Sequence, residues 1–202
     1  MIAIIDYGMG NIASVFNMLK RIGYTDAVFT NDSAVIEKAT KLILPGVGSF
    51  DNGMMNLEKH NLISVLNKKV IENNTPVLGI CLGMQLLTKS SEEGRLNGLG
   101  WIDAETVKFN FPDSDLKVPH MGWNYINIEK KSALTTIGEK QKYYFVHSYY
   151  VKCNNPNNVL ATCDYGGKFS CIINHDNVYG AQFHPEKSHK YGMNFLKKFI
   201  EL

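Results

Sequence analysis

The chain has 202 residues, 45% of them hydrophobic, and a formal net charge of +2. This length allows one sizeable core, so we expect a single domain over residues 1–202. The lysines are spread along the chain rather than clustered, which argues against a nucleic-acid or membrane-surface role.

The N-terminus and the cysteines argue against a secreted protein and against a small disulfide-bonded or zinc-binding domain. Met1–Ile5 is apolar, but it is short and has no basic region before it, so it predicts a first strand rather than a signal peptide. No apolar run is long enough to span a bilayer. The four cysteines form no Cys-x-x-Cys pair, and we expect reduced thiols in a cytoplasm, no metal site and no cofactor.

The first half of the chain alternates strand and helix patterns. A strand ends at Asp6, apolar residues at helical spacing run to a stop at Gly23, and a short helix over 34–39 follows. A buried strand over 41–44, a helical pattern over 54–72 and a strand over 76–81 come next. This order predicts an α/β fold with a doubly wound, mostly parallel sheet and flanking helices.

After Gly100 the pattern changes to short segments rich in aromatic and β-branched residues. We expect additional short, partly antiparallel strands there, with a hairpin loop at His175–Asn177 and a closing helix over 188–202. The expected strands are 105–110, 123–128, 143–151, 168–174 and 178–183.

Cys81 stands where the strand over 76–81 turns into a helical pattern. Gly-x-Cys-x-Gly at such a junction is the thiol version of the nucleophile elbow, in which the glycines allow a sharp turn. A helix N-terminus also favours the thiolate, the form that attacks. We therefore expect Cys81 to be a covalent nucleophile.

A nucleophilic cysteine needs a base, and the base needs a group that orients it. His184 precedes Pro185, which favours an extended backbone, and residues two apart in an extended segment point to the same side. His184 and Glu186 are therefore a candidate pair, although a structural histidine is the alternative reading. We expect surface roles for His60, His175 and His189 and hydrogen-bonded structural roles for His120 and His147.

Acyl transfer also needs donors for the oxyanion. We expect one from the backbone N–H of Leu82, directly after the nucleophile. The second comes from Val47, at the end of a neighbouring strand, where the flanking glycines let its peptide turn toward the site or away from it. A plain strand-to-loop turn remains the alternative for this segment.

These motifs resemble those of the class I (triad) glutamine amidotransferases. Gly79-Ile-Cys-Leu-Gly-Met-Gln85 and Gln182-Phe-His-Pro-Glu-Lys-Ser188 carry the resemblance to the superfamily. Within it the chain is similar to the glutaminase subunits of imidazole glycerol phosphate synthase, of the histidine pathway. The motifs supporting that narrower resemblance are Asp6–Asn11, Leu44–Phe50, Val118–Asn124 and Tyr144–Tyr149.

The resemblance implies that Cys81 attacks the side-chain amide of glutamine and that His184, oriented by Glu186, moves the proton. It places Gly48, Gln85, Ser148 and Tyr149 at the glutamine pocket. It also implies a heterodimer in which ammonia passes to a (β/α)8-barrel cyclase. Four residues match family positions at or near that interface, with a structural role as the alternative for each: Asn11, Trp123, Tyr144 and Lys187.

Three other functions stay open. Relatives of these subunits supply ammonia for amidino-sugar formation on surface polysaccharide or flagellin, and the segments 90–94, 165–167 and 184–193 are similar to that branch. A stand-alone cysteine hydrolase would need neither Gln85 nor the interface motifs. A scaffold subunit that has lost activity would not need Cys81, His184 and Glu186 together.

Overall fold

The first half of the chain alternates strands and helices in the computed structural model, which describes residues 1–112, 115–138 and 140–202. The expected α/β class is confirmed, with a central, mostly parallel sheet and flanking helices. The elements are β1 Ile2–Ile5, α1 Ile12–Arg21, β2 Ala27–Thr30, α2 Ser33–Lys38, β3 Lys41–Gly46, α3 Phe50–Lys59, α4 Leu62–Asn67, a π-helical turn Lys68–Glu72, β4 Val77–Cys81 and α5 Leu82–Leu86.

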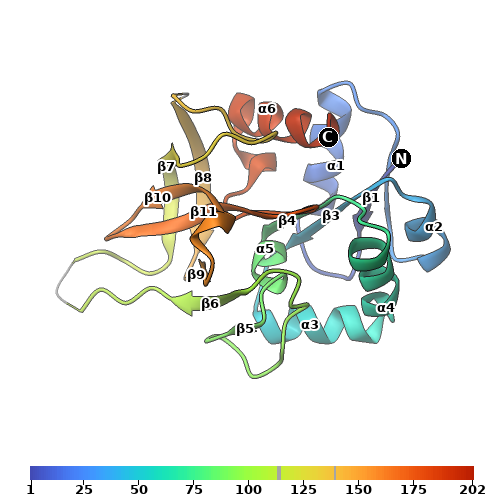
Figure 1. The fold of residues 1–202 in the computed structure, drawn as a ribbon, viewed down its shortest axis with the longest axis horizontal. Coiled ribbons are helices and arrows are strands. Elements are labelled where there is room, and N and C mark those ends of the chain that lie inside the picture. Colours follow the sequence, from blue (N-terminus) through green and yellow to red (C-terminus); the bar gives the residue numbers. More distant parts are fainter. Residues whose placement is uncertain (113–114, 139) are drawn as a thin grey trace.

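The parallel strands are covered by helices on both faces. The order β2-β1-β3-β4-β12 is parallel throughout, and β12 (Val178–Ala181) pairs with β4. Side chains alternate between the faces of a strand, so Ile2 and Ile4 pack with the core around α1 and α6 (His189–Ile200), whereas Ala3 and Ile5 pack with the core around α3 and α4. Figure 1 shows these two helical layers above and below the sheet.

The second half extends the same sheet with antiparallel strands, which lie to one side of the parallel part (Figure 1). Beyond β12 the order continues β11-β10-β7-β8, and β9 connects β11 to β6 and β5. The pairings here are antiparallel except that of β5 with β6, which is parallel. The strands are β5 Ser90–Ser91, β6 Ala104–Lys108, β7 His120–Ile128, β8 Gln141–His147, β9 Tyr149–Cys153, β10 Val159–Asp164 and β11 Lys168–His175; 3-10 turns cover Pro156–Asn158 and Pro185–Lys187.

Several expected boundaries were wrong. The expected helix over 54–72 begins at Phe50 and is interrupted at Asn61, whose backbone is left-handed (φ 54°). The single strand expected over 143–151 is two strands, β8 and β9, because the chain turns at Ser148 to pair with different neighbours. The strands β2 and β10 had not been expected.

Single residues fix the start of one helix and the turn of one hairpin. Asp32 caps α2 by accepting a hydrogen bond from the backbone N–H of Ala34 at 2.8 Å. The hairpin between β11 and β12 turns at Asp176, which is left-handed (φ 49°). Within the described part of the chain, no helix combines the length and apolar character needed to cross a membrane.

Candidate active site

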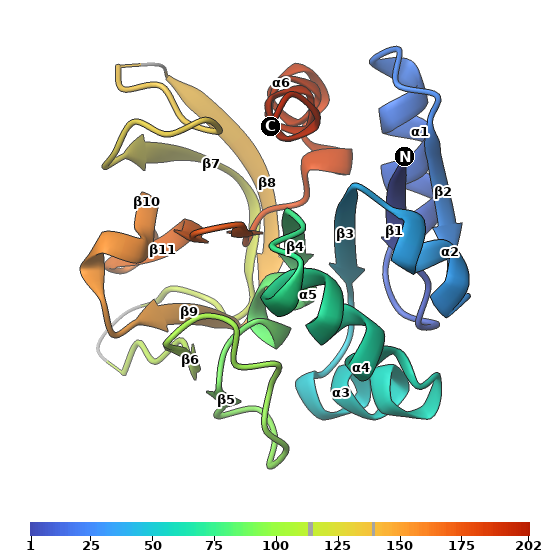
Figure 2. The same cartoon turned by 45° about the vertical axis from the view of Figure 1, so that its right-hand side comes forward.

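Cys81 ends β4 at the carboxyl edge of the parallel strands, where such sheets form their ligand sites. Its φ and ψ angles are 54° and −112°, a conformation that L-residues rarely adopt. The strain of the expected turn is therefore at the cysteine itself. Figure 2 shows α5 leaving the end of β4 beside β3.

The two glycines that flank Cys81 serve close approach rather than torsional freedom, which corrects the expected reason for them. Neither has a left-handed φ. A Cβ on Gly83 would overlap the carbonyl oxygen of Leu44, and a Cβ on Gly79 would lie 2.6 Å from the carbonyl oxygen of Gly83. The turn folds back against β3 because both positions lack a side chain.

The register between β3 and β4 brings the predicted oxyanion segment to the nucleophile. Gly46 is paired with Cys81, so Val47 and Gly48 continue past the strand end next to Leu82. Gly48 has a φ of 113°, which favours glycine. Val47 is 43% exposed and is not part of the buried core.

His184 and Glu186 form a buried pair. Nδ1 of His184 lies 2.8 Å from Oε1 of Glu186, and each side chain is only 1% exposed. The backbone between them is not extended throughout, as had been expected: His184 is extended, but Glu186 lies in the 3-10 turn Pro185–Lys187. The proline opens this turn, and the turn brings the carboxylate back to the imidazole.

The nucleophile and the base line the same pocket and are close enough to interact, but Nε2 of His184 does not meet hydrogen-bond geometry. Nε2 of His184 is buried and has no hydrogen-bond partner among the described residues, while Sγ of Cys81 donates to the carbonyl oxygen of Val146 at 3.9 Å. Burial acts to lower the pKa of His184, but polar interactions with Cys81 and Glu186 outweigh it and raise the pKa above its ordinary value. His184 is therefore suited to accept the proton of the thiol.

A pocket of about 310 Å³ joins these groups. Predicted residues from four separate segments line it, and Glu186 lies behind His184. Gln85 is nearly buried in α5 and donates to the carbonyl oxygen of Tyr149 at 3.0 Å. The predicted residues that line the pocket are Val47, Gly48, Cys81, Leu82, Gln85, Ser148, Tyr149 and His184.

Three of the predicted interface residues gather on one surface. The ring of Trp123 lies 6.2 Å from that of Tyr144, and Nζ of Lys187 lies 5.9 Å above the Tyr144 ring. Trp123 also stacks on His189, with ring centroids 5.4 Å apart. Asn11 is the N-cap residue of α1, a helix that contacts the turn Pro185–Lys187.

The structure adds site residues that the sequence analysis had not singled out. The Gln182 amide lies against Cys81, and His147 lines the pocket as part of a hydrogen-bonded pair with His120, which agrees with the structural role expected for these histidines. The Tyr7 hydroxyl is buried beside Gly46 and has no hydrogen-bond partner in the described chain. Burial raises the pKa of this hydroxyl, and a thiolate at Cys81 raises it further, so the hydroxyl stays protonated.

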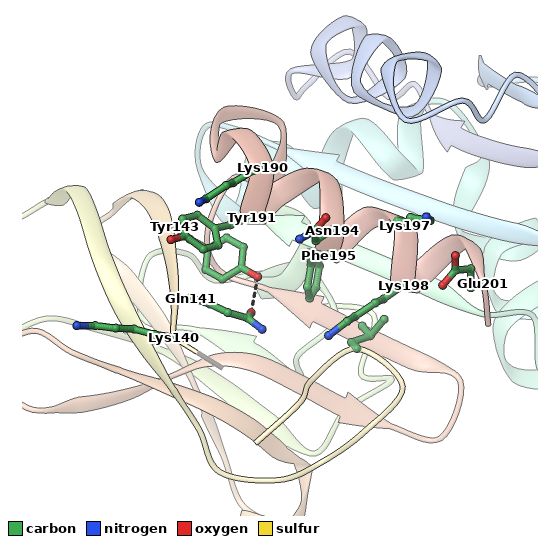
Figure 3. Close-up of a pocket in the computed structure, with 11 residues that line it drawn as sticks. Lys140, Gln141, Tyr143, Lys190, Tyr191, Asn194, Phe195, Lys197, Lys198 and Glu201 are labelled. Carbon is green, nitrogen blue, oxygen red and sulfur yellow. Dashed lines mark hydrogen bonds between the residues drawn. The ribbon is translucent and has the colours of Figure 1, made fainter. Parts of the chain in front are cut away.

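A larger pocket, about 500 Å³, lies between α6 and the start of β8 (Figure 3). Its wall includes Tyr143, whose hydroxyl donates to Oε1 of Gln141 at 2.7 Å, and several lysines, among them Lys140 and Lys190. It contains neither Cys81 nor His184. The predicted catalytic residues that line a pocket, Cys81 and His184, therefore line the smaller one.

Comparisons with known proteins agree with this geometry. A family model described as glutamine amidotransferase class-I matches residues 3–202. The imidazole glycerol phosphate synthase subunit HisH 2 of Methanococcus maripaludis is 58% identical over 202 residues, covering 100% of this chain and 99% of that protein. The subunit HisH 2 of Pseudomonas aeruginosa is 52% identical over 203 residues, covering 100% of both.

Among solved structures, one described as a crystal structure of glutamine amidotransferase superposes with a TM-score of 0.75 at 19% identity. The match covers 98% of this chain and 97% of that one. At this level of identity the superposition shows the fold alone.

Proposed function

The chain belongs to the class-I glutamine amidotransferase family, and on that premise we propose that it is the glutaminase subunit of an imidazole glycerol phosphate synthase in histidine biosynthesis. The observation that carries the proposal is the meeting of Cys81 with the buried His184–Glu186 pair in one pocket. The pathway follows from the full-length relatives, which are imidazole glycerol phosphate synthase subunits.

The hydrogen bond between His184 and Glu186 sets the direction of proton transfer. A carboxylate only accepts, so Nδ1 of His184 carries the proton and Nε2 is left as the base. In the proposed reaction Nε2 takes the thiol proton, and Sγ of Cys81 then attacks the side-chain carbonyl carbon of glutamine. The proton then moves to the leaving nitrogen, ammonia departs, and water releases glutamate from the thioester.

The oxyanion of the tetrahedral intermediate would form beside the backbone N–H groups of Leu82 and Val47. The pairing of Gly46 with Cys81 supports this assignment because it sets the two segments side by side. Gly48, Gln85, Ser148 and Tyr149 line the same pocket, which supports their role in holding the amino-acid part of glutamine.

A partner subunit follows from the relatives, which are named as subunits of a synthase. We propose a (β/α)8-barrel cyclase that receives the ammonia and docks where Trp123, Tyr144 and Lys187 gather, with Asn11 near this surface. Exposed apolar side chains on β7 support this location, since Met121 is 63% exposed. A single domain over 1–202 and a cytoplasmic location complete the proposal.

The alternative pathway, amidino-sugar formation, is not favoured, because the relatives carry the name of the histidine-pathway synthase. Expression in a histidine auxotroph that lacks its own glutaminase subunit tests the assignment. Growth without histidine is expected. A chain that folds and hydrolyses glutamine beside a sugar-modifying partner, but does not restore growth, would support the alternative instead.

A direct assay tests the chemistry. The purified chain, mixed with a cyclase subunit and its nucleotide substrate, should release one glutamate for each imidazole product. Rapid hydrolysis by the chain alone, with no gain from the cyclase, would instead indicate a stand-alone hydrolase. Absence of hydrolysis in the complex would indicate a scaffold subunit.

A further inference from the structure

The Cys81 thiolate needs hydrogen-bond donors for its stabilisation, because no long helix begins at this residue. The helix that follows it, α5, has only five residues, so the stabilisation that a helix N-terminus gives to a thiolate is small here. A polar side chain contacts the sulfur from the other side: Nε2 of Gln182 donates to Sγ at 3.9 Å. Gln182 is 0% exposed and follows β12 directly, two residues before His184.

Gln182 is held in place by a chain of buried hydrogen bonds. Its Oε1 accepts from Nε2 of Gln85 at 3.3 Å, and the same Gln85 nitrogen donates to the carbonyl oxygen of Tyr149. That carbonyl oxygen also lies 2.8 Å from Nδ1 of His147, whose Nε2 lies 3.2 Å from Nδ1 of His120. This series of hydrogen bonds therefore runs from the nucleophile through α5 and β9 to β8 and β7.

The backbone carbonyl of Tyr149 determines the direction of every bond in this chain. A carbonyl oxygen only accepts, so the Gln85 atom that faces it is the amide nitrogen, and His147 carries its proton on Nδ1. Both amide hydrogens of Gln85 are then used, and the Gln182 atom that faces Gln85 is its oxygen. The Gln182 amide N–H consequently points at the sulfur of Cys81, and a flipped amide would set two N–H groups against each other.

The donor and acceptor roles in the His120–His147 hydrogen bond are fixed because both histidines are neutral. His147 and His120 are buried among aromatic rings, including those of Phe109 and Phe145. In neutral His147, Nε2 is a hydrogen-bond acceptor, so Nδ1–H of His120 donates to it. A positive charge beside the sulfur is therefore carried by His184, once it has taken the thiol proton, rather than by His147.

We propose that Gln182 is a further catalytic residue, one whose side-chain amide donates to the Cys81 thiolate and favours that form before glutamine is attacked. The inference rests on the proposed glutaminase function. A hydrogen bond to a charged acceptor is stronger than one between neutral groups, so the contact stabilises the thiolate more than the thiol. Gln85, with both amide hydrogens used, offers its oxygen to a ligand rather than its N–H groups.

Alkylation of Cys81 by iodoacetamide tests the contact without glutamine or a partner. The rate on the full chain is followed across neutral and alkaline pH by mass spectrometry of the Cys81 peptide, which separates it from the other three cysteines. Gln182→Leu removes the donor and is expected to slow alkylation at neutral pH about tenfold, with the profile displaced to higher pH. The matched control is Gln141→Leu, the same change at a buried glutamine that lines the larger pocket rather than the pocket of Cys81. Cys81 in this variant should be alkylated at the native rate.

A second variant covers the case in which Gln182→Leu does not fold. Gln182→Asn keeps the amide but draws its N–H away from the sulfur, so it should change the profile in the same direction by a smaller factor. Native alkylation profiles in whichever of these variants fold would overturn the proposal. Glutamine hydrolysis by the native complex is measured separately, so a failed glutaminase assignment would be recognised independently of the alkylation result.

Discussion

Nδ1 of His184 lies 2.8 Å from Oε1 of Glu186, and both side chains are almost completely enclosed. A buried carboxylate in this position fixes the imidazole tautomer and stabilises the imidazolium that forms when the thiol proton is taken. Glu186→Gln keeps an acceptor near Nδ1 but removes the charge. We expect kcat for glutamine hydrolysis to fall by about 10²- to 10⁴-fold.

The control for this change is Glu58→Gln, the same substitution at an exposed position in α3. Steady-state kinetics with glutamine should leave the control at the native rate. A Glu186→Gln variant that retains native kcat would remove the carboxylate from the mechanism.

Ser188 connects the base to β8 and is expected to position it. Its hydroxyl donates to the carbonyl oxygen of His184 at 2.6 Å and accepts from the backbone N–H of Tyr144 at 3.0 Å. Ser188→Ala removes the acceptor of the Tyr144 N–H, whereas the carbonyl oxygen of His184 keeps its bond from the backbone N–H of Lys187 at 3.1 Å. The free energy of unfolding should fall by about 1–3 kcal/mol. Because the base loses its anchor, kcat should fall while KM for glutamine stays nearly native.

Urea unfolding and glutaminase kinetics check this prediction together. Ser64→Ala, at an exposed position in α4, is the matched control and should change neither quantity. A rise in KM with native kcat would contradict the positioning role.

The pair of neutral histidines predicts a loss of stability in mild acid. Burial lowers the pKa of His147 to about 3, and the repulsion that protonated His120 or His184 would exert acts in the same direction, although the bond to the Tyr149 carbonyl opposes it. Burial also lowers the pKa of His120 to about 4. An unfolded histidine titrates near about 6.5. Between the folded and unfolded pKa values, the unfolded chain therefore binds more protons than the folded chain. The contribution of the neutral pair to the free energy of unfolding is complete above the unfolded pKa and is lost as pH falls through the folded pKa values.

Each histidine contributes a slope of up to about 1.4 kcal/mol per pH unit in that window. Urea unfolding at several pH values between about 4.5 and 7.5 measures the slope. His147→Gln should give a flatter curve, and His175→Gln, at an exposed hairpin position, should keep the native slope. Equal slopes in the native chain and in His147→Gln would show that His147 is charged in the folded state.

The unformed bond between Cys81 and His184 predicts activation by the partner. Sγ donates to the carbonyl of Val146, and Nε2 of His184 is unpaired within the described structure, so the resting site is not assembled for attack. Binding of the substrate-loaded cyclase should raise glutamine turnover by about 10²-fold or more, equivalent to about 2.7 kcal/mol at the transition state. Comparable turnover of glutamine with and without the cyclase would contradict this gating.

The positions near the chemistry could be predicted from the sequence because they lie in short, contiguous motifs. Cys81 stands between two glycines, and His184 and Glu186 are two residues apart. The register of β3 against β4 was not visible in the sequence, yet the strand order alone suggested that Val47 would lie at the same sheet edge as Cys81. Local patterns and sheet topology were sufficient for these residues.

The parts that were missed depend on contacts between distant segments. The strand β2 has four partly exposed residues at the sheet edge, and its sequence has too little periodicity to separate it from a loop. The bonds from Gln182 to Gln85 and from Gln85 to Tyr149 join residues 97 and 64 positions apart, so no local pattern indicates them. Within the Gln182–Ser188 motif, roles were predicted for His184, Glu186 and Lys187 but not for Gln182, whose side chain contacts the sulfur.

Replacement of Cys81 with alanine, assayed with two nitrogen donors, tests the central claim most directly. The complex with the cyclase is supplied either with glutamine or with an ammonium salt, and formation of the imidazole product is followed. If Cys81 is the nucleophile of a glutaminase, the Cys81→Ala complex should make no product from glutamine and should make it at the native rate from ammonia. Product formation from glutamine at the native rate, or loss of product from both donors, would contradict the account.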